Sequence, residues 1–135
     1  MSGLDKIYGA KARLFLSYSG TIEGLAEELR ESLELKEFRV EFDKYPPHEK
    51  VGASETLGFE MWLEQSNLLP NFPYIFEVST QMVSNEVFDG RLHDLSLWLG
   101  KFVAIPGKMD CFVLVDEKEM EGYLFNNRSV KLVKL

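Results

Sequence analysis

The residues with the most suggestive chemistry are carboxylates that alternate with apolar residues in short segments. Over residues 37–44 and 58–64, charged side chains occupy nearly every second position, and a tryptophan shares these positions in the second segment. Alternate side chains of a strand point to opposite faces, so these residues are predicted to project together from one face of a sheet. With an acidic residue from segment 74–79, the predicted face comprises Glu41, Asp43, Glu60, Trp62, Glu64 and Glu77.

Carboxylates around an exposed tryptophan are typical of a surface that binds a protein. Interface hot spots favour aromatic side chains, and a charged rim steers a partner of opposite charge. The sequence therefore predicts that this face binds a basic protein partner, with the loop residues Tyr45 and His48 extending the surface. The alternative interpretation is an ordinary solvated sheet face, with Trp62 half-covered by the neighbouring loop.

The chain contains no recognisable catalytic or metal-binding motif. His48 and His93 fall in different predicted elements and belong to no metal-ligand spacing. Cys111 lies in an apolar segment, where a thiol is normally an inert hydrophobe. The acidic run 116–121 lacks the spaced oxygen ligands and the glycine of a calcium loop, and the glycines are scattered. We therefore expect no enzyme activity, no metal and no cofactor, although motifs do not reveal a site assembled from distant residues.

The charge of the chain excludes several classes of partner. Its 22 acidic and 15 basic side chains give a net charge of −7, which repels nucleic-acid phosphates and anionic membranes. The single cysteine cannot form an internal disulfide, and residues 1–6 lack the features of a signal peptide. No apolar run approaches the roughly 20 residues that span a bilayer. We expect a cytoplasmic protein that binds neither nucleic acid nor membrane.

Hydrophobic periodicity predicts the elements that position these side chains. Apolar residues at helical spacing over residues 22–33 and 84–103 indicate two amphipathic helices. A Pro-Pro pair makes residues 45–52 a loop, because proline lacks the amide donor and fixes φ. Strands are predicted at 13–18, 37–44, 58–64, 74–79 and 110–115, with a final strand or hairpin at 121–134.

The predicted order of elements is β-α-β-β-β-α-β-β, which corresponds to two successive β-α-β-β units. The segments that begin near Leu14 and Ile75 open the two units similarly, each followed by a polar turn and a helix. A chain of 135 residues, 45% of them hydrophobic, matches a single domain spanning residues 1–135. The economical arrangement is an α+β fold, with two helices on one face of a mostly antiparallel sheet.

A short motif near the start of the chain resembles the opening of a TIR domain. Residues 15–19 read Phe-Leu-Ser-Tyr-Ser, and a predicted helix separates them from Val-Glu-Phe-Asp at 40–43. TIR domains that cleave NAD use a glutamate on a later helix. At the corresponding place this chain has Asp89-Gly90-Arg91-Leu92, without a glutamate in register.

Two further resemblances concern overall character. The repeated β-α-β-β order is similar to that of GyrI-like domains, which hold amphipathic cationic molecules between two such units. A small, acidic, aromatic-rich domain also resembles bacterial immunity proteins of polymorphic and contact-dependent toxins, which cover the active surface of a toxin. The second resemblance implies a protein-binding module that neutralises a basic toxin domain; a GyrI-like sensor and a TIR-like domain are the alternatives.

Overall fold

The computed structural model describes residues 9–46, 48–56, 58–80, 92–107, 109–126 and 129–135. The predicted class is confirmed, since two helices and a mostly antiparallel sheet make an α+β fold. In chain order, the elements are β1 (Gly9–Leu16), α1 (Ile22–Ser32), β2 (Arg39–Phe42), β3 (Lys50–Thr56), β4 (Phe59–Leu69), β5 (Phe72–Thr80), β6 (Leu92–Asp94), α2 (Ser96–Gly107), β7 (Cys111–Asp116), β8 (Glu121–Asn126) and β9 (Ser129–Lys134).

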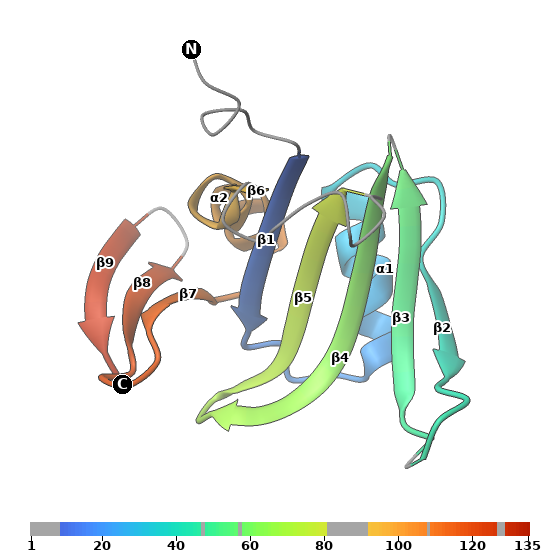
Figure 1. Cartoon of the computed structure of the whole chain (residues 1–135), viewed down its shortest axis with the longest axis horizontal. Coiled ribbons are helices and arrows are strands. Elements are labelled where there is room, and N and C mark those ends of the chain that lie inside the picture. The colour runs from blue at the N-terminus through green and yellow to red at the C-terminus, as the bar shows by residue number, and fades with distance from the viewer. Residues whose placement is uncertain (1–8, 47, 57, 81–91, 108, 127–128) are drawn as a thin grey trace.

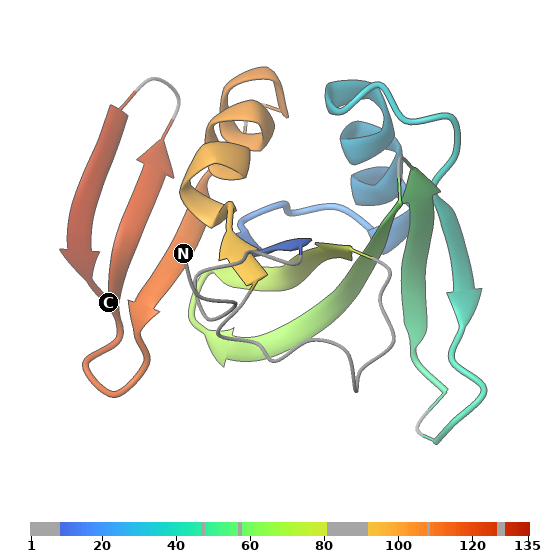
Figure 2. The same cartoon turned by 45° about the horizontal axis from the view of Figure 1, so that its top comes forward.

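All nine strands of the described chain belong to one sheet. Its order is β2-β3-β4-β5-β1-β7-β8-β9, and the short β6 pairs in parallel with β1. The other pairings are antiparallel. Both helices lie on the same side of the sheet, as Figures 1 and 2 show from two directions. Among the described residues, the opposite side of the sheet is therefore not covered by a helix.

The order of strands differs from the predicted one, partly because β3 falls where a loop is predicted. β3 begins inside the predicted loop 45–52 and lies between β2 and β4. Its inward-facing residues, Gly52 and Ser54, are small. A Cβ on Gly52 would lie 2.8 Å from a ring carbon of Phe38, and the Ser54 hydroxyl donates a 2.6 Å hydrogen bond to the carbonyl of Glu37. Small buried residues carry little hydrophobic signal, so alternation does not reveal this strand.

The second helix begins later than the predicted range 84–103. Residues 84–91 lie outside the described residues, and Leu92–Asp94 form β6 instead of helix. α2 begins at Ser96, whose N–H and hydroxyl donate to the Asp94 carboxylate at 2.9 and 2.6 Å. Because α2 follows β6 and not the strand near Ile75, the predicted pair of β-α-β-β units is wrong.

Neither of the described helices is long and apolar enough to cross a membrane.

Helix α1 agrees closely with its predicted range. Thr21 is the N-cap, and its hydroxyl accepts a 3.1 Å hydrogen bond from the N–H of Gly24. The apolar positions of the helix repeat at helical spacing and turn toward the sheet. The buried residues of α1 are Ile22, Leu25, Ala26 and Leu29.

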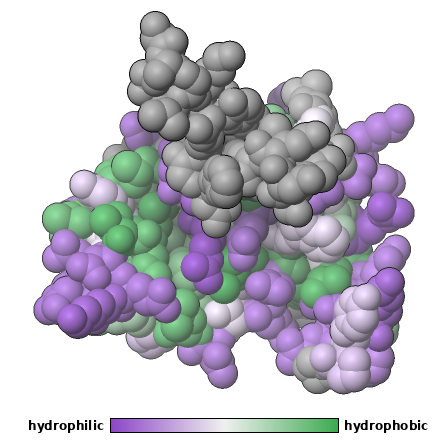
Figure 3. Space-filling view, in the orientation of Figure 1, coloured by the Kyte–Doolittle hydropathy of each residue, from purple (hydrophilic) through white to green (hydrophobic). Residues whose placement is uncertain are grey.

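Apolar side chains gather in two clusters, one on each side of the sheet. Under the helices, Leu14, Leu63 and Phe76 are fully buried beside the apolar stripe of α1. The smaller cluster on the opposite side consists of Phe15, Leu69, Phe72, Ile75 and Phe112. In Figure 3, which views that opposite side, hydrophobic surface gathers toward β7–β9 and hydrophilic residues predominate toward β2–β4. The polar part of this side is where the predicted surface residues lie.

Candidate functional site

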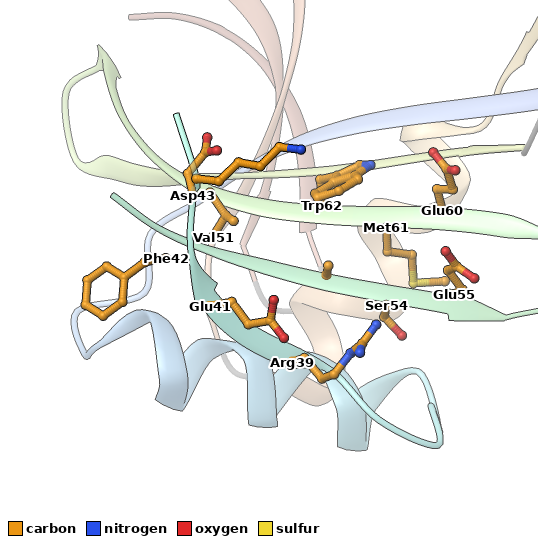
Figure 4. A pocket seen from close by; sticks show the side chains of 12 residues that line it. Arg39, Glu41, Phe42, Asp43, Val51, Ser54, Glu55, Glu60, Met61 and Trp62 are labelled. Atoms are coloured by element: carbon orange, nitrogen blue, oxygen red, sulfur yellow. The ribbon is translucent and has the colours of Figure 1, made fainter. Parts of the chain in front are cut away.

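The predicted surface residues lie on the side of the sheet opposite the helices. Met61 and Leu63 of β4 are buried under the helices, so the residues that alternate with them point the other way. Trp62 is 49% exposed there. Figure 4 shows Trp62 and Glu60 on one side of β4 and Met61 on the other. We call the surface formed by Glu41, Asp43, Glu60, Trp62, Glu64 and Glu77 the acidic face.

Strand register decides which of these residues are neighbours. Trp62 of β4 pairs with Glu77 of β5, and Arg13 of β1 pairs with Glu77 on its other side. On the β2 side, Glu41 pairs with Val51 of β3. The strands of Glu41 and Trp62 are therefore not direct neighbours, because β3 lies between them. Val51 and Ala53 of β3 are small apolar residues, and they line the space beside Trp62.

Two hollows result, and Trp62 lines both. The Arg39–Glu60 hollow has a volume of about 330 Å³ between β2, β3 and β4 (Figure 4). Its acidic lining residues are Glu41, Asp43, Glu55 and Glu60. The Trp62–Glu77 hollow has a volume of about 390 Å³ and is lined by Asp43, Val51, Trp62, Leu63, Glu64 and Glu77. Each predicted sheet residue thus lines at least one hollow.

The two hollows differ in charge. Arg39 and Lys44 accompany the carboxylates of the first hollow. In the second hollow, none of the described lining residues is cationic. The cation that reaches its edge is Arg13, whose Nε lies 3.9 Å from Oε1 of Glu77, with both side chains about half exposed. The Trp62–Glu77 hollow therefore carries unbalanced negative charge.

The pKa of Glu64 is affected by its burial and then by this charge imbalance. Partial burial raises the pKa of Glu64, and the charge of Glu77 raises it further. Arg13 acts in the opposite direction, while Glu49 and Asp43 add smaller upward contributions. A cation bound in the hollow would favour the ionised form of Glu64, because an opposite charge stabilises a carboxylate.

Tyr45 and His48 lie beside the acidic face in the loop between β2 and β3, but line neither hollow. The Tyr45 N–H donates to Oδ1 of Asp43 at 3.1 Å, and Nδ1 of His48 lies 2.9 Å from the Asp43 carbonyl oxygen. His48 also adopts a left-handed backbone with φ 60°. Asp43 thus orders this loop, and the Tyr45 ring, 65% exposed, extends from it into solvent.

The cysteine thiol lies in the core and not among these carboxylates. Cys111 is buried and free, and its burial, followed by the charge of Asp110, raises the pKa of the thiol well above its usual range. His93 lies in β6, far along the chain from the loop that holds His48. Among the described residues, no group of three His, Cys, Asp or Glu side chains could hold a metal ion. The TIR-related positions 89–91 lie outside the described residues.

Several residues of the site were not indicated by the sequence pattern. Val51 and Glu55 come from β3, whose pattern is masked by small residues, and Arg13 comes from a strand distant in sequence. Arg13 follows the same alternation as the buried Leu14, so its outward direction could have been read from β1 alone. The pairing of Arg13 with Glu77 could not have been predicted from the sequence, because that pairing depends on the order of the strands in the sheet.

Comparisons with protein-family models, with curated proteins and with solved structures found no match for this chain. The immunity-type, GyrI-like and TIR-like resemblances therefore stay predictions. Since fold alone does not define function, function has to be inferred from the chemistry of the site.

Proposed function

We propose that the chain is a protein-binding module that captures a basic partner on the acidic face. Its mode of action would be that of an immunity protein, which neutralises a basic toxin domain by covering the active surface of the toxin. The observation that carries this proposal is the Trp62–Glu77 hollow, which combines three carboxylates with a half-exposed tryptophan.

The chemistry of the hollow suits a lysine or arginine side chain from the partner. The Trp62 ring offers an aromatic surface, and a cation over such a ring gains roughly 0.5–1 kcal/mol at exposed sites and about 2 kcal/mol when desolvated. Glu64 and Glu77 supply carboxylate oxygens to the same space. A bound cation would also relieve the repulsion between these two carboxylates. The favourable free energy of binding would therefore exceed that of a single ion pair.

The rest of the acidic face would act mainly on the rate of association. Acidic residues also line the Arg39–Glu60 hollow, and the chain has a net charge of −7. A field of one sign increases the rate at which an oppositely charged partner meets the surface, particularly at low salt. Occlusion needs only shape and charge, so it requires no nucleophile or general base on this face.

The first experiment is to identify the partner. The chain, carrying an affinity tag, is used at low salt to capture proteins from its source organism, and the captured proteins are identified by mass spectrometry. We expect a basic protein whose capture weakens as salt rises. Recovery of no specific protein at low salt would count strongly against the proposal.

Variants then show which surface of this chain binds that partner. Glu41→Lys, Asp43→Lys and Glu60→Lys should together slow association at least about tenfold at low salt, since charge reversal removes electrostatic steering. Trp62→Ala should increase the dissociation rate because it removes the aromatic surface. Trp98→Ala and Glu117→Lys are matched controls at exposed positions outside both hollows. Association and dissociation rates that match the unmodified chain for all acidic-face variants would exclude this face as the binding surface.

A further inference from the structure

A second recess lies on the other side of the sheet, between α1 and α2. Its volume is about 510 Å³. Figure 2 shows the two helices above the strands that form its floor. Ala12 and Val78 belong to that floor, while Leu33 and Leu95 lie at the ends of the helices that border it. We call this recess the interhelix groove.

The walls of the groove are held by backbone hydrogen bonds. At the start of α2, the Leu95 N–H donates to the carbonyl of Lys11 at 2.7 Å, and the Arg13 N–H donates to the hydroxyl of Ser96 at 2.9 Å. At the end of α1, the Leu35 N–H donates to the carbonyl of Arg30 at 2.8 Å. The start of α2 is therefore fixed to β1, and the chain that leaves α1 is fixed to the last turn of that helix.

The lining of the groove is mostly apolar. Phe59, Met61, Leu99 and Trp98, which is 57% exposed, complete the apolar lining. The polar lining residues are Lys11, Ser32 and Glu34. Leu33, Val78 and Leu95 are only half-buried, so apolar surface remains in contact with water. Such surface favours an occupant that removes it from water.

We infer that the interhelix groove binds an uncharged, ring-containing apolar small molecule. A volume of about 510 Å³ falls within the range of small-molecule sites and exceeds what one inserted side chain would fill. Within the described residues, no buried side-chain nitrogen or oxygen lacks a hydrogen-bond partner, so no buried polar side chain there calls for a charged ligand. An unpaired charge would also be unfavourable against the buried apolar floor at Ala12 and Met61. Phe59 and Trp98 provide aromatic contacts for a ring.

This site is independent of the proposed function, because the groove and the acidic face lie on opposite sides of the sheet. The two tryptophans make the sites separable, since Trp62 reports on the acidic face and Trp98 on the groove. In the Trp62→Phe variant, Trp98 is the remaining tryptophan of the chain. A ligand that contacts the Trp98 ring in the groove should then change the emission of this single tryptophan directly.

The test uses N-phenyl-1-naphthylamine, an uncharged two-ring dye whose emission rises in apolar surroundings. The unmodified chain and Trp62→Phe should both bind it saturably, with one dye per chain and a change in Trp98 emission in the second variant. Ala12→Phe should weaken dye binding tenfold or more, because its ring occupies the floor of the groove. Trp98→Ala should weaken binding several-fold, and since residue 98 is exposed this change also serves if Ala12→Phe fails to fold.

Circular dichroism establishes that each variant is folded, and light scattering gives its mass in solution. Absence of saturable dye binding would overturn the inference. So would equal binding by the unmodified chain, Ala12→Phe and Trp98→Ala. A dimer that dissociates on Trp98→Glu substitution would also overturn it, by showing that a second copy of the chain occupies the groove.

Discussion

Glu64 allows the electrostatics of the acidic face to be tested without a partner. Its pKa is raised by burial and by Glu77, so the ionised side chain destabilises the folded state relative to a neutral one. Glu77 pairs with Trp62, which places Glu64 diagonally from Glu77 and not directly opposite. We therefore expect Glu64→Gln to raise the free energy of unfolding near neutral pH by about 0.2–0.5 kcal/mol, the lower part of the range for cross-strand pairs.

The sign of this effect depends on pH. A carboxyl with a raised pKa in the folded state keeps its proton there while the unfolded chain has already lost it, so stability falls as pH rises through the two pKa values. At about pH 3, below the ordinary glutamate pKa of about 4.3, Glu64 is protonated in both states. The advantage of Glu64→Gln should be absent there and complete above the folded-state pKa. Urea unfolding at both pH values measures the difference.

Two neighbouring substitutions identify the source of the shift. NMR titration of the Glu64 carboxyl should show its pKa falling in Glu77→Gln, which removes a like charge, and rising in Arg13→Gln, which removes a favourable one. Glu117→Gln, in the exposed turn after β7, is the control and should leave stability and the Glu64 pKa unchanged. The reasoning would be refuted if Glu64→Gln lowered stability near neutral pH, or if Glu77→Gln left the Glu64 pKa where it was.

Three further predictions concern the fold that carries the site. Gly122→Ala should destabilise the domain by about 3 kcal/mol in urea unfolding, because the new Cβ would lie 2.2 Å from the backbone oxygen of Val113; a loss below 1 kcal/mol would contradict this packing. Thr21→Ala should cost about 1 kcal/mol by removing the N-cap of α1, and Thr21→Ser should retain most of that stability. Cys111 should react with a thiol reagent only at the rate of unfolding, since it is buried with a raised pKa; rapid labelling of the folded chain would show that the thiol is accessible.

Local patterns in the sequence determined those elements that depend only on interactions between residues close together in the chain. The cap at Thr21 and the helical spacing from Ile22 to Leu29 define α1 without reference to the rest of the chain. Alternation around Trp62 likewise predicts which side chains of β4 point away from the core, because side-chain direction in a strand depends only on position. The hairpin of β8 and β9 within residues 121–134 also agrees with the sequence pattern.

Tertiary structure alone decided how these elements meet. β3 lies between β2 and β4 because Gly52 and Ser54 are small enough to fit under Phe38 and beside Glu37. Small residues of this kind give no hydrophobic periodicity from which the strand could be predicted. The pairing of β1 with β5 brings Arg13 to Glu77 across more than 60 residues of chain. The sequence by itself thus determined that an acidic, tryptophan-bearing strand face exists. Long-range strand pairing decided that this face contains two hollows of different charge, and that an apolar groove lies behind it.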